Sequence, residues 1–81
     1  MSSRAAYTKL GKYLASTREA GGMSQAQLAE RLGRVQSVVA KTETGRRRLD
    51  VIEFIELAKA LGISPQRLFK GVLSQLHQKT N

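Results

Sequence analysis

Side chains that can bind a polyanion gather between Arg34 and Arg48. This stretch holds five basic residues against a single acid, Glu43, and three of the five follow one another directly, at positions 46–48. The whole chain has 14 Lys and Arg against 6 Asp and Glu, a formal net charge of +8. The sign reverses just beyond the basic stretch, between Asp50 and Glu56. A basic face with an acidic one elsewhere is typical of nucleic-acid binders, although charge of this kind can also serve solubility alone.

Polar side chains that can read base edges lie at the start of the same stretch. A helix is expected there from about residue 36 to 44, with four residues on its outward face: Gln36, Ser37, Ala40 and Lys41. Glutamine pairs bidentately with adenine, lysine donates to guanine, and serine or alanine makes smaller contacts. Val38, at the rim of this face, is a candidate for contact with a thymine methyl group. The alternatives are that Gln36 and Ser37 are solvated helix residues, and that Lys41 reaches a phosphate instead of a base.

A preceding short helix must hold this expected base-reading helix in place. Ser24 and Gln27 form a capping-box pattern that opens it, and Gly33 suits a left-handed turn at its end. Ala29 is small where the two helices approach most closely. The residues expected on the shared apolar seam are Leu28, Leu32 and Val39. Two helices joined in this way form a helix-turn-helix, whose second helix enters the major groove of DNA.

The remaining chain predicts further helices. The first runs from about residue 6 to 20, with Gly21 and Gly22 as its stop. Asp50 with Glu53 opens a later one, and its expected apolar side carries Val51, Phe54, Ile55, Ala58 and Leu61. Gly62 closes that helix, and Ser64–Pro65 starts another. The late leucines belong either to the core or to a dimer seam: Leu68, Leu73 and Leu76.

Composition limits the function classes. The 81 residues contain no cysteine, and the one histidine, His77, lies in a polar tail. We therefore expect no metal, no cofactor and no enzyme activity, since the chain also lacks a glycine-rich phosphate loop. Without a long apolar run or a signal-peptide core, the expected location is cytoplasmic and no membrane partner is expected. The expected division is an N-terminal arm (1–5), one DNA-binding domain (6–70) and a partly helical tail (71–81).

The pattern as a whole resembles the Xre-type helix-turn-helix domains, which include the phage lambda-type repressors and Cro. The resemblance runs from about Leu10 to Phe69. It is strongest at Ser24-Gln25, Leu28-Ala29, Leu32-Gly33, Gln36-Ser37, Glu43, Gly45 and the segment Ala58-Lys59-Ala60-Leu61-Gly62-Ile63. It implies an all-α, compact four- to five-helix bundle of the lambda-repressor-like type that binds double-stranded DNA, usually as a homodimer.

The resemblance also implies roles for single residues. Gln36 and Ser37 would lead base reading, and Gln25 would hold a phosphate and brace Gln36. The full set of expected phosphate contacts is Ser24, Gln25, Arg34, Gly45, Arg46, Arg47 and Arg48. The residues expected to act structurally are Arg18, Glu43, Gly33 and Ala29. Of these, Arg18 would pair with Glu43 and tie the first helix to the end of the third.

Four positions depart from the family pattern: Arg34, Val35, Val38 and Thr42. Arg34 and Val35 stand where many members have an apolar residue and then a small hydroxyl or proline. Val35 has no oxygen with which to cap the third helix, a loss of about 1 kcal/mol, and is expected to bury its methyl groups instead. Thr42 replaces a usual aliphatic residue on the inner face. These changes concern base preference more than the fold.

The leading hypothesis is a sequence-specific transcriptional regulator, a repressor, that binds a short two-fold operator as a homodimer. The alternative is an antitoxin that binds a toxin and regulates its own operon through the same domain. A restriction–modification controller or a phage repressor would share the domain as well.

Overall fold

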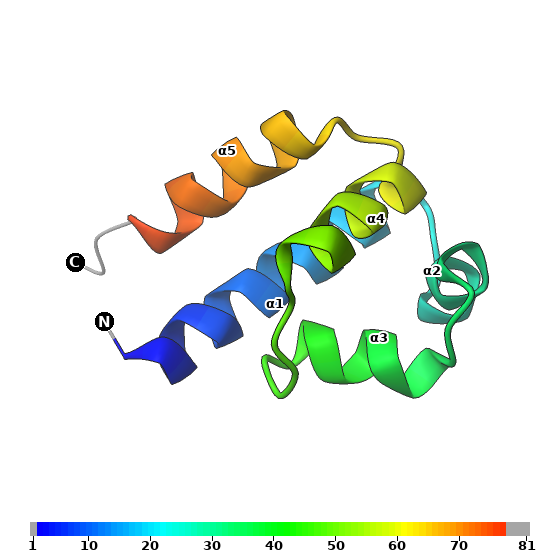
Figure 1. The fold of residues 1–81 in the computed structure, drawn as a ribbon, viewed down its shortest axis with the longest axis horizontal. Helices are drawn as coiled ribbons and strands as arrows, with labels where there is room; N and C mark the ends of the chain where they lie inside the picture. Colours follow the sequence, from blue (N-terminus) through cyan, green and yellow to red (C-terminus); the bar gives the residue numbers. More distant parts are fainter. Residues whose placement is uncertain (1, 78–81) are drawn as a thin grey trace.

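The computed structural model describes residues 2–77, and these residues form five α-helices (Figure 1). The helices are α1 (Ser3–Ala20), α2 (Gln25–Leu32), α3 (Gln36–Glu43), α4 (Val51–Leu61) and α5 (Pro65–Leu76). The predicted all-α bundle of four to five helices is confirmed.

The predicted helix signals lie where the helices begin and end. Ser24 Oγ accepts from the Gln27 amide, and Gln27 Oε1 accepts from the Ser24 amide over 2.8 Å, so the capping box of α2 is complete. Asp50 and Glu53 form the same arrangement at the start of α4. Gly33, with φ +67°, ends α2 in the left-handed region, where a side chain would be strained. Local chemistry therefore sets these boundaries.

Helices α1 and α5 lie at the two ends of the described chain. The first helix begins at Ser3, not near residue 6, because Ser2 Oγ accepts from the Ala5 amide and caps it. Residues 3–5 of the expected arm are therefore helical. At the other end α5 extends through Leu76, while residues 78–81 lie outside the described part of the chain.

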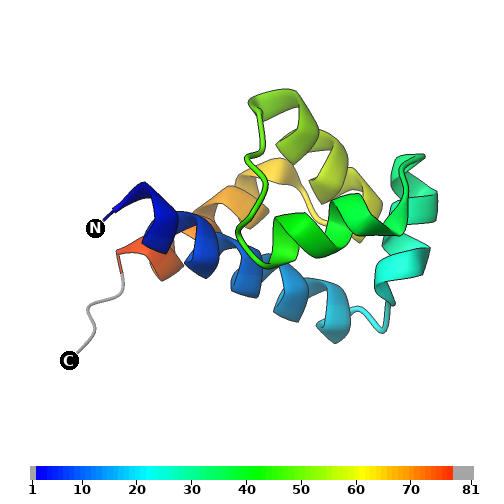
Figure 2. The same ribbon diagram turned by 90° about the horizontal axis from the view of Figure 1, so that it is seen from below.

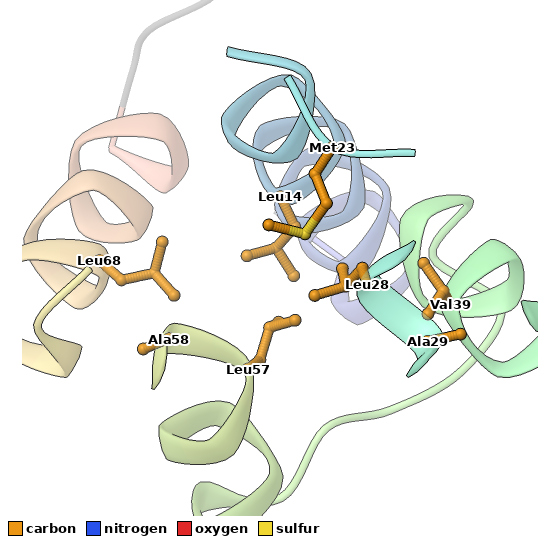
Figure 3. Packing of buried hydrophobic residues seen from close by; sticks show 8 residues of the cluster. All are labelled: Leu14, Met23, Leu28, Ala29, Val39, Leu57, Ala58 and Leu68. Carbon is orange, nitrogen blue, oxygen red and sulfur yellow. The ribbon is translucent and has the colours of Figure 1, made fainter. Parts of the chain in front are cut away.

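One apolar cluster joins all five helices (Figure 3). Its buried members are Leu14, Met23, Leu28, Ala29, Val39, Leu57, Ala58 and Leu68. The predicted apolar side of α4 was partly wrong. Leu57 is buried although it was not predicted, whereas Val51 is 73% exposed. The buried stripe centres on Leu57 and Ala58, and Val51 occupies the first position of the helix, outside this stripe.

The arrangement of the helices places the surface of α3 and the surface of α5 on different sides of the molecule. Helix α1 packs against both α3 and α5, and Figures 1 and 2 place α3 and α5 on opposite sides of α1 and α4. Gly11, which is buried, lets α1 approach the end of α3: a Cβ there would lie only 2.4 Å from the carbonyl oxygen of Glu43. The outward side of α3 is thus left free of the other helices.

Candidate nucleic-acid interface

The turn between α2 and α3 is short and fixed by the backbone. The backbone amides of Gly33 and Arg34 both donate to carbonyl groups in the last turns of α2. The Arg34 amide donates to the Ala29 carbonyl over 2.9 Å. Ala29 and Val39 are both buried where α2 packs against α3. The small side chain of Ala29 permits this contact, so α3 has little freedom to move relative to α2.

The predicted base-reading residues do not share one environment. Gln36, Ser37 and Lys41 are exposed, whereas Ala40 and Val38 are half-buried. Val38 lines a small, partly open pocket together with Leu28 and Leu49, among others. Helix α3 therefore presents three polar side chains to the outside, while Val38 also serves its packing.

A chain of side-chain hydrogen bonds runs from the first residue of α3 to α1. Gln36 Nε2 lies 3.4 Å from Gln25 Oε1, to which it donates a long hydrogen bond. Gln25 Nε2 donates to Glu43 Oε1 over 2.9 Å. One N–H of the Gln25 amide group remains available for another acceptor, because a primary amide has two.

The Glu43 carboxylate also accepts two hydrogen bonds from the Arg18 guanidinium. Arg18 Nε donates to Glu43 Oε2 over 2.7 Å, and Arg18 Nη2 donates to Glu43 Oε1 over 3.0 Å. Arg18 Nη1 donates to the Met23 carbonyl over 2.6 Å. Both charged side chains are buried. The hydrogen bond to Glu43 raises the pKa of Arg18 above its ordinary value, more than burial lowers it.

The consecutive arginines of the loop after α3 have different surroundings. Arg46 is exposed. Arg47 donates to Glu53 Oε2, and Arg34, from the turn before α3, lies 3.5 Å from the same oxygen. The Arg48 guanidinium lies 5.9 Å from the centre of the Tyr7 ring, a cation–π arrangement. The arginines expected to contact phosphates are therefore partly engaged within the protein.

Glu53 was predicted only as a capping residue. Its pairing with Arg47, followed by its bond to the Asp50 amide, lowers its pKa below the ordinary carboxyl value. An acid at the third position of α4 gives no sign in the sequence that two arginines from separate loops converge on it. The charge reversal after Arg48 is the only available signal.

Two further expected phosphate contacts are also engaged. The Ser24 hydroxyl completes the capping box of α2. The Gly45 amide donates to the Thr42 carbonyl over 3.2 Å, and the Arg46 amide donates to the Lys41 carbonyl over 2.9 Å. A DNA phosphate would have to share these two backbone amides, whereas the Ser24 hydroxyl only accepts in the cap and keeps its O–H to donate.

The structure shows the surroundings of two positions that depart from the family pattern, Val35 and Thr42. Val35 is the N-cap of α3 and makes no side-chain capping bond, as predicted. The expectation that it buries its methyl groups was wrong, since Val35 is 67% exposed. Thr42 is buried, and its hydroxyl donates to the Val38 carbonyl over 2.8 Å. A polar group on the inner face is thus satisfied within α3 itself.

Comparison with known proteins assigns the family. The helix-turn-helix family profile matches residues 14–68, which is more than half of the chain. An XRE-family like protein from Pseudomonas syringae pv. tomato is 44% identical, with a TM-score of 0.76 over 86% of this chain and 85% of that one. The chain belongs to the XRE-type helix-turn-helix family, a family of DNA-binding transcription regulators.

Other solved structures resemble this XRE-type domain. The restriction-modification controller protein C.AhdI from Aeromonas hydrophila is 38% identical, with a TM-score of 0.75 over 80% of this chain and 98% of that chain. The clp gene regulator ClgR from Corynebacterium glutamicum has a TM-score of 0.81 at 22% identity, over 91% and 96% of the two chains, and shows a likeness of fold. No curated protein sequence gives a significant match.

Residues 2–77 of this XRE-type domain contain no group of three or more histidine, cysteine or acidic side chains arranged to hold a metal ion. None of their helices has both the length and the apolar character required to cross a bilayer.

Proposed function

We propose that this protein is a transcription regulator that inserts α3 into the major groove of an operator, with Gln36, Ser37 and Lys41 as its base readers. One observation carries the proposal: these three polar side chains are exposed on one short helix that packs against both α1 and α2. Gln36 is additionally positioned by its contact with Gln25. Val38 and Ala40, both half-buried, would offer only part of their surface to a thymine methyl group.

The proposed phosphate contacts are the donor groups that still have an N–H or a positive charge available for a DNA phosphate. Arg46 is exposed, Arg48 lies beside Tyr7, and Gln25 keeps one free amide N–H. We propose these as the main anchors on the sugar–phosphate backbone. The Ser24 hydroxyl, which accepts from the Gln27 amide, keeps its own O–H to donate to a phosphate. The Gly45 amide contributes as a shared donor, because its hydrogen bond to the Thr42 carbonyl is already formed. Arg34 and Arg47 contribute only when they leave Glu53.

A homodimer on a two-fold operator is the form of binding that we propose. An apolar groove lies between the start of α1, the start of α4 and α5, and its lining residues include Val51, Phe54, Phe69 and Leu76. Phe69 is 53% exposed and meets Phe54 edge to face, with ring centroids 6.2 Å apart. Because α5 lies away from α3, a partner seated on this groove would leave both recognition helices free. Half-sites about one DNA turn apart, roughly 34 Å, are then expected.

We propose two candidate biological roles. Repression by occupying a promoter is the simplest role for a DNA-binding domain of this size. The 38% identity to a restriction-modification controller over 98% of its length favours a second candidate, a controller of a neighbouring gene set. The antitoxin hypothesis stays a prediction, and co-purification with the product of an adjacent small gene would test it.

A mobility-shift experiment tests the DNA-binding proposal. Affinity for duplex DNA should fall steeply between low and physiological salt, because phosphate contacts release counterions. Gln36→Ala should lose sequence preference, whereas Arg46→Ala should weaken binding to all sequences alike. Binding that ignores salt, or two variants with the same profile, would contradict the proposal.

The dimer is tested separately by sedimentation or light scattering. Val51→Ser together with Phe69→Ser should yield a monomer whose helical content is unchanged, since both side chains are largely exposed. The matched control is Ile52→Ser, because Ile52 is exposed but does not line the groove. A wild-type protein that stays monomeric on its operator would exclude the dimer.

A further inference from the structure

One carboxylate connects the two segments that flank the recognition helix. Arg34 lies in the turn before α3, and Arg47 lies in the loop after it. The guanidinium groups of both residues reach Glu53 Oε2: Arg34 Nη2 at 3.5 Å, and Arg47 Nη2 in a closer hydrogen bond. Residues separated by the whole length of α3 therefore share a single acceptor oxygen.

The carboxylate of Glu53 is itself held in place. It occupies the third position of α4, where its Oε1 accepts from the Asp50 amide over 3.2 Å and its own amide donates to Asp50 Oδ1 over 2.7 Å. Its side chain is only 16% exposed. Helix α4 is fixed to the core by Leu57 and Ala58. The arginines are thus drawn toward α4, and Glu53 cannot follow them to a distant phosphate.

The pairing changes which charges DNA can meet. The side chain of Arg34 is 41% exposed, so it is accessible to a polyanion although it is paired. A guanidinium that leaves Glu53 for a phosphate loses one favourable partner to gain another. Arg46, which precedes Arg47 in the loop after α3, is exposed and does not pair with Glu53. Next to α3, Arg46 and Arg48 are therefore exposed to any phosphate, whereas Arg34 and Arg47 are restrained by Glu53.

We propose that Glu53 is a selectivity determinant, which restrains binding to random DNA by holding Arg34 and Arg47 away from phosphates. The proposal rests on the DNA-binding function proposed above. Binding to random sequences depends on phosphate contacts, so two released arginines would add their full effect there. At an operator the domain must also satisfy its base contacts, which select one register, so it cannot shift along the duplex to bring a phosphate to each released side chain as it can on random DNA. Glu53 acts through the arginines and is a positioning residue.

The size of the effect follows from counterion release. Each new phosphate contact on duplex DNA steepens the plot of log affinity against log salt by about 0.9, equivalent to roughly eightfold in affinity at about 0.1 M salt. Release of one arginine should therefore steepen the slope by about 0.9, and release of both by about 1.8.

The test compares Glu53→Gln with Glu56→Gln. Both substitutions remove one negative charge from α4. Glutamine at position 53 keeps an Oε1 acceptor for the Asp50 amide, while Glu56 is exposed and pairs with no arginine among residues 2–77. Glu53→Gln should tighten binding to random duplex by roughly 8- to 60-fold, according to whether one or both arginines gain a phosphate, with the steeper salt slope, and should tighten operator binding less. Glu56→Gln should produce only a small change. Equal affinities and slopes for the two variants would overturn the proposal.

Arginine variants give a second measurement that does not require Glu53→Gln to fold. In the otherwise native protein, Arg34→Gln with Arg47→Gln should reduce random-DNA affinity less than Arg46→Gln alone. The opposite ranking would overturn the proposal. A purely structural role for Glu53 would lower the melting temperature seen by circular dichroism without steepening the salt slope, and this result too would overturn it.

The outcomes separate this proposal from the DNA-binding function beneath it. If the wild-type protein shows no salt-dependent DNA binding, both fail together. If the wild-type protein binds an operator while the Glu53 and Glu56 variants behave alike, only the role of Glu53 fails.

Discussion

The Arg18 guanidinium and the Glu43 carboxylate form a bidentate pair that joins α1 to the last residue of α3, with N–O distances of 2.7 and 3.0 Å. Both side chains are buried. Glu43 also accepts from Gln25, which in turn contacts Gln36. The position of the proposed base reader therefore depends on an ion pair at the other end of α3.

Removing one partner of this pair should be strongly destabilising. Arg18→Ala leaves the Glu43 carboxylate buried without its counter-charge, so we expect a loss of about 3–5 kcal/mol in unfolding free energy. Urea denaturation followed by circular dichroism would measure it. Glu19→Ala is the control, because Glu19 is exposed and lies 4.0 Å from Arg18 Nη2, which predicts little effect. Similar losses in both variants would contradict this role.

Adding one methyl group at Gly11 should separate α1 from α3. The new Cβ would lie 2.4 Å from the Glu43 carbonyl oxygen, a backbone atom that cannot move alone. Gly11→Ala should cost about 1–3 kcal/mol through overpacking and weaken DNA binding as α3 shifts. Gly21→Ala provides the comparison, because its nearest atom would lie at an ordinary 3.5 Å. A Gly11 variant as stable as wild type would show that the helices do not meet as described.

The missing cap at Val35 can be supplied. Val35 has the extended backbone of an N-cap, with φ −78° and ψ 153°, and its side chain is largely exposed. Val35→Ser should therefore raise the unfolding free energy by about 1 kcal/mol through a new hydrogen bond to an amide of the first turn. Val35→Ala, which gains no hydroxyl, should not reproduce the increase. Thermal melts of the two variants decide the matter.

Stability should depend on acid through Glu53. Arg47 lowers the folded-state pKa of Glu53, so its contribution is fully present above the ordinary carboxyl pKa and is lost as pH falls through the lowered value. The difference in unfolding free energy between wild type and Glu53→Gln should thus shrink as the pH is lowered from neutral to about 3. Denaturation curves across this range measure the difference, and a constant gap would contradict the ion pairing.

Local signals in the sequence predicted much of the fold. Capping boxes at Ser24 and Asp50, and left-handed glycines at positions 33 and 62, depend on neighbouring residues only, and all four are present. The start of α1 was placed too late because one serine, Ser2, is a weaker signal than a complete capping box. Helix periodicity did not identify Leu57 as core, because the buried direction of α4 depends on which helices cover it.

The candidate site was less accessible from the sequence. The outward positions of Gln36, Ser37 and Lys41 follow from helical periodicity, and they are exposed. The sharing of Glu53 by Arg34 and Arg47 depends on how two loops fold against α4, which no local pattern encodes. The exposure of Val35 likewise depends on where the turn lies relative to the core.

Selection of bound duplexes from random DNA tests the central claim most directly. If α3 reads bases through Gln36, Ser37 and Lys41, the selected sequences should share a two-fold consensus with half-sites roughly 34 Å apart. Gln36→Ala should erase the preference at one position of each half-site while preserving the spacing. Enrichment of no sequence, or an identical consensus for wild type and Gln36→Ala, would contradict base reading by this helix.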